Sequence, residues 1–256
     1  MDNQIIYQWQ VTKYNPDYRN ENGHYTLAQE WTCPSEIGNF IEGKVFTLKE
    51  YLSIESAYVK AIVNFMKDSG IDSLRIIGLE VNVTEADKSS ILYESEFDHL
   101  TLDEDVIISE SEVRTIAKMV LRNFIWCQFY SKGNFFVHFG WDYYMYIGSA
   151  EKCLSAIKSA EENGLFVEQY KSPYYFTEEE ATRMIQWNEI DAEVIVGDEE
   201  LIGIPLEKYR NILNLSEEHP VIGSFEITKE KSKFFQRYLE HKIDFTKYEY
   251  WFWGGK

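Results

Sequence analysis

The sequence has very few cysteines and none of the spacings that tie small proteins together. Its 256 residues contain three cysteines, Cys33, Cys127 and Cys153, which are widely separated and form no C-x-x-C pair. An odd number of isolated cysteines argues against a disulfide framework and is typical of a reducing compartment. We therefore expect a cytoplasmic protein.

Long apolar runs are also missing. No stretch reaches the roughly 18 consecutive apolar residues that a membrane helix needs, and the first nine residues carry no basic region. Proline and glycine are scarce, with 5 and 14 residues, whereas hydrophobic residues make up 45% of the chain. This composition predicts a compact folded protein rather than a disordered or fibrous one. We expect no membrane partner.

The short motifs that fix a chemistry are absent. The sequence contains no P-loop, no G-x-G-x-x-G turn, no H-E-x-x-H pair, no G-x-S-x-G elbow and no calcium-loop register. Its five histidines are far apart and show no paired helical spacing, so we predict no metal site and no cofactor. Catalysis is not excluded, but the absence of these motifs favours a non-catalytic role.

Basic residues are outnumbered, 25 against 43 acidic ones, which gives a net charge of −18. Between Glu85 and Glu112, ten acidic residues face a single base, Lys88. The negative electrostatic field of these residues repels the phosphate backbones of nucleic acids and attracts basic partners, so we predict no nucleic-acid partner. The alternative interpretation is a solvated surface that keeps the protein soluble. The acids predicted to bind a basic protein are Asp98, Asp103, Glu104, Asp105, Glu110 and Glu112.

Hydrophobic periodicity in the first half of the chain predicts alternating strands and helices. Residues 5–14 alternate as a half-buried strand, and a capping box at 47–50 opens a helix that ends at Gly70. Residues 74–83 form the next predicted strand, with Gly78 as a bulge. A second capping box at 109–112 opens a helix that we expect to continue to about residue 131.

An aromatic run covers residues 135–147, where seven of thirteen side chains are Phe, Tyr or Trp. We predict a hairpin with the three-residue loop 140–142, in which His138 pairs with Tyr144. One face of this hairpin is then core-like. The other face carries Phe136, His138, Tyr144 and Tyr146.

A helix over 150–162 and a strand over 165–168 complete the order βαββαβ between about residues 74 and 170. This order is typical of a ferredoxin-like core, here with an acidic insertion at 85–109. We expect an α+β protein with three parts in one compact body: a strand and helix at 1–70 packed on the core, the core itself at 71–172, and an α+β extension at 173–256. In the extension, the patterns predict helices over 177–189, 206–213 and 229–242 and strands over 192–196, 221–228 and 247–253.

These observations support two hypotheses about function. The first is a non-catalytic interaction protein, such as an inhibitor or immunity-type protein that binds a basic macromolecule through its acidic surface. The alternative is an enzyme or small-ligand-binding protein with a pocket at the hairpin, formed by His138, Asp142, Tyr144 and Tyr146. His138 could instead be a packed core residue beneath the aromatic strand 248–253. Exposed aromatic side chains in that strand would favour a homo-oligomer.

Overall fold

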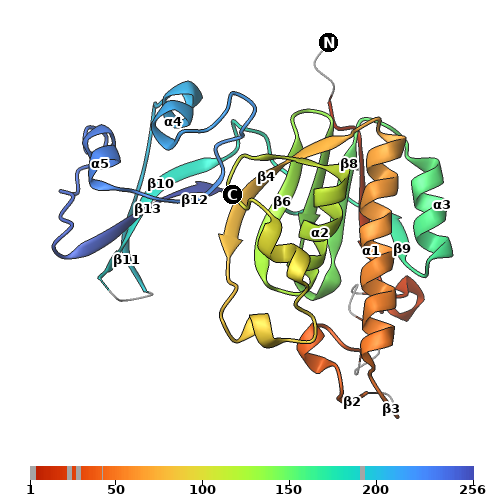
Figure 1. Cartoon of the computed structure of the whole chain (residues 1–256). Coiled ribbons are helices and arrows are strands. Elements are labelled where there is room, and N and C mark those ends of the chain that lie inside the picture. The colour runs from red at the N-terminus through yellow and green to blue at the C-terminus, as the bar shows by residue number, and fades with distance from the viewer. Residues whose placement is uncertain (1–3, 22–24, 27–29, 42, 191–193) are drawn as a thin grey trace. The chain divides into compact units, whose positions relative to one another are not determined.

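The computed structural model describes residues 4–21, 25–26, 30–41, 43–190 and 194–256. The chain divides into two compact units, Met1–Pro173 and Tyr174–Lys256, which we describe separately. Both units combine α-helices with antiparallel sheets, so the predicted α+β class is confirmed (Figure 1).

A seven-stranded sheet forms the centre of the amino-terminal unit. Its strands run in the order β5-β4-β6-β7-β8-β1-β9, and every ladder is antiparallel. A separate two-stranded ribbon pairs β2 with β3. The strands are β1 (Tyr7–Thr12), β2 (Phe40–Ile41), β3 (Lys44–Val45), β4 (Ser73–Val81), β5 (Ile107–Ser109), β6 (Ile125–Ser131), β7 (Phe135–Phe139), β8 (Met145–Ser149) and β9 (Phe166–Gln169).

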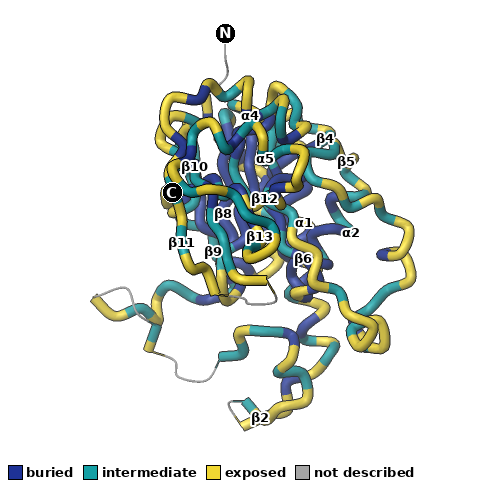
Figure 2. Tube along the Cα trace, turned by 90° about the vertical axis from the view of Figure 1, so that its left-hand side faces the viewer, coloured by how far each residue is buried: buried dark blue, intermediate teal, exposed yellow. Residues whose placement is uncertain are grey.

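Three helices, α1 (Leu48–Asp68), α2 (Glu110–Leu121) and α3 (Leu154–Glu162), cover one face of this sheet (Figure 1). The predicted capping box opens α1, because the Glu50 amide donates to the Thr47 hydroxyl at 3.2 Å and the Thr47 amide donates to the Glu50 carboxylate at 2.9 Å. The hydrophobic core lies between these helices and the strands. Figure 2 shows buried residues concentrated along the strands and exposed residues along the connections.

The ferredoxin-like arrangement is not confirmed. Helix α2 ends at Leu121, and residues 125–131 form β6 instead of continuing the helix, so a third strand follows α2 before α3. Asn123 has a positive φ of 62°, a conformation that ends helices. Ile125, Cys127 and Phe129 are buried while their neighbours are half-buried, which is the two-residue period of a strand. The acidic insertion also contributes β5 to the sheet edge.

The predicted bulge in β4 is confirmed. The β4–β6 register shifts between Ile77 and Glu80, and Gly78 adopts a positive φ of 65°. The strand at the start of the chain, β1, lies inside the sheet, between β8 and β9.

The β7–β8 hairpin is present, but its predicted register is wrong by two residues. Phe139 pairs with Met145 and His138 pairs with Tyr146, so residues 140–144 form the loop. Because side chains alternate with a period of two, this shift leaves each strand residue on its predicted face. The core-like face does pack into the core.

The carboxy-terminal unit is a four-stranded antiparallel sheet in the order β11-β10-β13-β12, with two helices. Residues 182–189 form a strand, so the helix predicted over 177–189 is wrong; their alternate burial and pairing on both sides explain the difference. Residues 191–193, which include part of the strand predicted over 192–196, lie outside the described residues. The elements are β10 (Thr182–Glu189), β11 (Ile195–Glu200), α4 (Leu206–Leu213), β12 (Gly223–Glu226), α5 (Lys229–Phe235) and β13 (Tyr248–Gly255).

The second unit has a hydrophobic core of its own. Ile185, Tyr250 and Phe252 from the sheet pack with Tyr209 from α4 and Phe235 from α5. The aromatic strand near the end of the chain, β13, is an inner strand of this sheet. Its most deeply buried rings are therefore part of this core.

Candidate functional site

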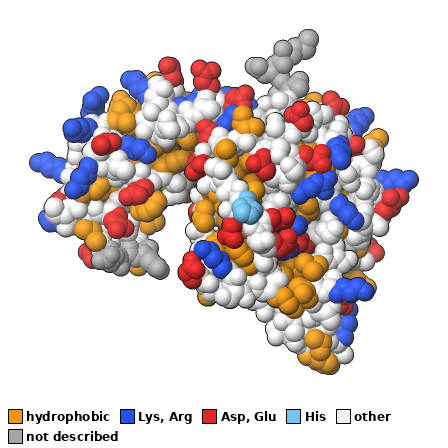
Figure 3. Space-filling model, in the orientation of Figure 1, with side chains coloured by type: hydrophobic (Ala, Val, Ile, Leu, Met, Phe, Trp, Pro, Cys, Tyr) orange, Lys and Arg blue, Asp and Glu red, His pale blue; other side chains and the backbone are white. Residues whose placement is uncertain are grey.

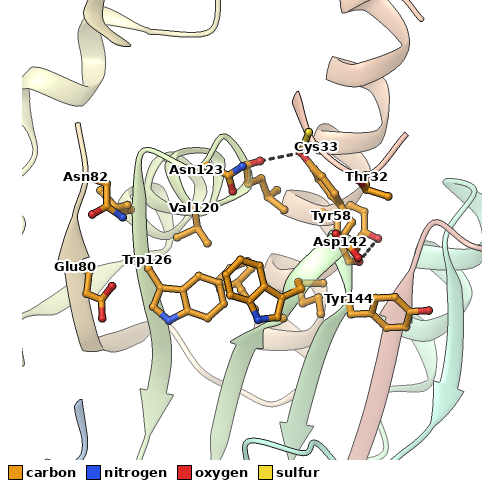
Figure 4. Close-up of a pocket in the computed structure, with 17 residues that line it drawn as sticks. Thr32, Cys33, Tyr58, Glu80, Asn82, Val120, Asn123, Trp126, Asp142 and Tyr144 are labelled. Atoms are coloured by element: carbon orange, nitrogen blue, oxygen red, sulfur yellow. Dashed lines mark hydrogen bonds between the residues drawn. The ribbon is translucent and has the colours of Figure 1, made fainter. Parts of the chain in front are cut away.

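A cavity of about 600 Å³ opens at the loop of the β7–β8 hairpin (Figure 4). All the residues that line it belong to the amino-terminal unit. Glu80 and Asn82, from the end of β4, lie at one side, and Asp142 and Tyr58 lie at the opposite side (Figure 4). Trp126, at the start of β6, lies between them. The cavity therefore brings together segments that are distant in the sequence.

The hairpin loop beside the cavity has an uncommon backbone conformation. Asp142 and Tyr143 both have positive φ values, 54° and 64°, a region that residues other than glycine adopt rarely. Such conformations cost on the order of 1–3 kcal/mol each and persist only where surrounding contacts hold them. They are also frequent at binding sites, so the loop is a candidate for function.

Hydrogen bonds from three buried tyrosines hold this loop. The Tyr58 hydroxyl donates to the Tyr143 carbonyl at 2.7 Å. The Tyr143 hydroxyl donates to the Leu121 carbonyl at 2.8 Å, and its oxygen lies 3.2 Å from the Tyr51 hydroxyl oxygen. Burial raises the pKa of all three phenols, so they stay protonated and keep their donors. The loop is thereby fixed to α1 and to the end of α2.

Two tryptophans form an aromatic wall of the cavity. The rings of Trp126 and Trp141 stack with their centroids 6.1 Å apart and their planes inclined by 28°. Trp141, in the loop, is 79% exposed. Val120, Ile125 and Met145 contribute apolar surface nearby. A ligand that enters from solvent therefore meets the flat tryptophan rings of this wall.

The sequence-predicted hairpin residues do not stay together. Asp142 and Tyr144 line the cavity, whereas His138 and Tyr146 do not. His138 is only 6% exposed and its Nδ1 lies 2.9 Å from the Ser172 hydroxyl oxygen. Its ring stacks on Phe136 with centroids 4.0 Å apart. Burial lowers the pKa of His138 to about 3, so the imidazole is neutral at physiological pH.

The six acids predicted to bind a partner have different surroundings. Asp98 accepts a hydrogen bond from the Tyr93 hydroxyl at 2.7 Å, and both Asp98 and Asp103 are exposed. Glu104 accepts hydrogen bonds from the backbone amides of Gly78 and Leu79 at 2.8 and 2.7 Å. These bonds give partners to the two amides at the bulge in β4.

The other three acids also have intramolecular roles. Asp105 pairs with Arg75 at 3.0 Å, and Glu110 pairs with Arg114 at 2.7 Å. Glu112 accepts from the Ser109 amide and hydroxyl in the capping box that opens α2, and these bonds lower its pKa. Figure 3 shows acidic and basic side chains interspersed over the helix-covered face. Much of the acidic segment therefore stabilises its own fold.

The three cysteines are free thiols. Cys127 and Cys153 are buried, which raises the pKa of each thiol. Cys33 lines the cavity and is half-buried. Among the residues that the structure describes, no group of three or more His, Cys, Asp or Glu side chains is placed to hold a metal ion.

Sequence reasoning missed most of the cavity. Glu80, Asn82, Asn123 and Trp126 reach it from three segments that lie outside the hairpin. The helix predicted to continue to about residue 131 includes Trp126, so its place beside the hairpin does not follow from that prediction. The alternation in residues 125–131 is the signal that would have placed it on a strand next to β7.

The helices in the described part of the chain include none that is long and apolar enough to cross a membrane. Comparison with known proteins gives one finding, which concerns the second unit alone. Residues 182–253 match the model of a family described as a domain of unknown function (DUF7683), and this segment runs from β10 into β13. No curated protein and no solved structure matches the chain.

Proposed function

We propose that this chain is a cytoplasmic, non-catalytic binding protein whose amino-terminal unit takes a ligand into the cavity at the β7–β8 loop. The observation that carries the proposal is a preformed cavity of about 600 Å³ with an exposed tryptophan on its rim. Ligand sites are typically concave, largely apolar and fixed before binding, with a few polar groups that orient the ligand. This cavity has each of those properties.

The chemistry of the buried histidine and cysteines in this unit favours binding over catalysis. The neutral, buried His138 cannot exchange protons with a ligand in the cavity. The buried thiols of Cys127 and Cys153 are kept protonated, and a thiol must ionise to act as a nucleophile. A cytoplasmic location agrees with the free state of all three cysteines.

A basic protein partner remains a second candidate, and an inhibitor or immunity-type protein is its concrete form. The observation that favours it is the exposure of Asp98 and Asp103 within a segment of high negative charge. In that case, affinity would fall steeply with salt and with Asp98→Asn and Asp103→Asn together. If neither salt nor these substitutions lower the affinity, this candidate is wrong.

The cavity is tested by screening planar and cationic metabolites for ligand-observed NMR signals with the full chain. Trp141→Ala removes the exposed ring of the wall, and Trp251→Ala removes an exposed ring from the other unit as a matched control. We expect compounds that bind the wild type and the control and lose binding with Trp141→Ala. The proposal fails if no compound binds, or if binding is unchanged by Trp141→Ala.

A further inference from the structure

The charges that line the cavity have one sign. Among the residues that the structure describes, its lining includes two carboxylates, Glu80 and Asp142, and no lysine or arginine. These carboxylates lie at opposite sides of the space above Trp126 (Figure 4). A cavity walled by low-dielectric rings and lined by one sign of charge concentrates counter-ions.

Neither carboxylate is neutralised by an ion pair within the described part of the chain. Glu80 is exposed and has no such partner. The ammonium of Lys13 is close enough to interact electrostatically with Asp142, but it is bonded to Glu30 at 2.9 Å and lies over the rings of Tyr14 and Trp31. Both carboxylates can therefore accept hydrogen bonds from a ligand.

The aromatic wall also favours a cationic ligand. The face of an indole ring carries negative potential and attracts cations, and a guanidinium also stacks on it plane to plane. Trp126 and Trp141, whose rings stack, line the cavity together with the two carboxylates. The amide oxygens of Asn82 and Asn123 add neutral acceptors at the rim. Rings, carboxylates and amides all favour a planar cation that carries hydrogen-bond donors.

We propose that the cavity binds an organic cation, and that an arginine side chain of a basic protein partner is its occupant. This inference rests on the proposed function and specifies its ligand class. The guanidinium stacks on the Trp126–Trp141 wall in the negative field of Glu80 and Asp142, while its aliphatic stem contacts the apolar lining. The net charge of −18 would attract such a partner.

The test compares two blocked tripeptides, Ac-Ala-Arg-Ala-NH2 and the same peptide with citrulline. Citrulline keeps the shape and planarity of arginine and lacks the charge. Binding is followed by the indole N–H signals of Trp126 and Trp141 in two-dimensional NMR of the full chain. We expect the arginine peptide to bind about tenfold more tightly, which is the size of a desolvated cation–π and charge contribution.

Variants locate the interaction. Glu80→Gln and Asp142→Asn should each weaken arginine binding several-fold without changing citrulline binding, and Trp141→Ala should weaken both. Glu161→Gln is the matched control, because it removes an exposed carboxylate on α3, outside the cavity, and should change neither. Equal affinity for the two peptides, or no effect of Glu80→Gln and Asp142→Asn, would overturn the inference.

Two further outcomes separate this inference from the function on which it rests. If neutral planar compounds bind in a Trp141-dependent manner and the arginine peptide does not, the cavity is a ligand site and the cation assignment is wrong. If neither class binds, both proposals fail. Free arginine amide is measured as well. If it binds as tightly as the arginine peptide, the site takes a small metabolite, and the proposal that a protein side chain occupies it is wrong.

Discussion

The imidazole of His138 is held neutral by burial within the amino-terminal unit. Its pKa, about 3 in the folded chain, is below the ordinary value of 6.5. As the pH falls, the unfolded chain therefore binds a proton first. The contribution of the neutral His138 imidazole to the free energy of unfolding is fully present above pH 6.5 and is lost progressively as the pH falls towards 3. We expect His138 to remove about 2 kcal/mol of unfolding free energy between pH 7 and pH 5.

Urea denaturation of the wild type and His138→Asn at the two pH values measures this contribution. The asparagine can still hydrogen-bond Ser172 and does not titrate. The difference in unfolding free energy between the two proteins should shrink by about 2 kcal/mol on going to pH 5. The other histidines cancel in this comparison. A difference that stays constant would mean that the imidazole is accessible to protons in the folded state.

At the level of single residues, the sequence predicted part of the cavity lining for a physical reason. Asp142 and Tyr144 belong to a local hairpin, and a hairpin can be derived from alternation and a turn. Glu80, Asn82 and Trp126 reach the same cavity through the β4–β6 pairing, which depends on tertiary packing. The contact of His138 with Ser172, in the segment after β9, could not be inferred either, because nothing local specifies it.

At the level of elements, one buried arginine joins three parts of the amino-terminal unit. Arg122, at the end of α2, pairs with Glu55 of α1 at 2.6 Å and with Glu94 of the acidic insertion. It also donates to the Leu92 carbonyl in that insertion. Burial lowers the pKa of Arg122, but the ion pairs more than offset this and raise it. The guanidinium stays charged and ties the insertion to both helices.

Arg122→Met should therefore destabilise the chain by about 3–5 kcal/mol, because Glu55 is only 3% exposed and would remain as an unpaired buried charge. Chemical denaturation of the single variant and of Arg122→Met with Glu55→Leu gives the test. The double variant should recover most of the loss. Arg114→Met, which breaks an exposed pair with Glu110, is the control and should cost less than about 1 kcal/mol. Equal costs for Arg122→Met and Arg114→Met would contradict the prediction.

The β7–β8 hairpin depends on a glycine opposite an aromatic ring. Gly148 pairs with Phe136, and a Cβ added to Gly148 would lie 2.1 Å from a ring carbon of Phe136. Gly148→Ala should destabilise the chain by about 1–3 kcal/mol, because the ring must move in a packed sheet. Thermal or urea unfolding of Gly148→Ala, Phe136→Leu and the double variant measures the coupling. We expect the double variant to be more stable than the sum of the single effects predicts, and strict additivity would show that the ring is not the obstacle.

The elements that the sequence predicted correctly are those with local signals at both ends. Helix α1 has a capping box and a terminal glycine, and α4 has the predicted bounds. Capping patterns at 109–112 and 177–180 predict helices that continue through residues 125–131 and 182–189. Both are inner strands with neighbours on two sides. Their pairing comes from distant parts of the chain, which a local pattern does not contain.

At the level of the whole molecule, the chain holds two separate hydrophobic cores. One cluster contains only residues of the amino-terminal unit, and the other contains only residues after Pro173. The family match falls entirely within the second unit. A segment with its own core, a four-stranded sheet and two helices meets the requirements of an independently folding domain.

We therefore predict that residues 174–256 fold alone, with dispersed two-dimensional NMR signals and one cooperative thermal transition. A fragment that starts at residue 182, as the family match does, is the informative control. It lacks the Glu178 and Ala181 carbonyls, which accept from the buried Arg183 guanidinium at 3.0 and 3.1 Å, and the Glu178 carboxylate that pairs with Arg210 at 3.0 Å. Losing acceptors for a buried charge should cost about 1–3 kcal/mol relative to the longer fragment. An unfolded 174–256 fragment would show that the second core requires the first 173 residues, whereas equal stability of the two fragments would show that residues 174–181 contribute nothing to this domain.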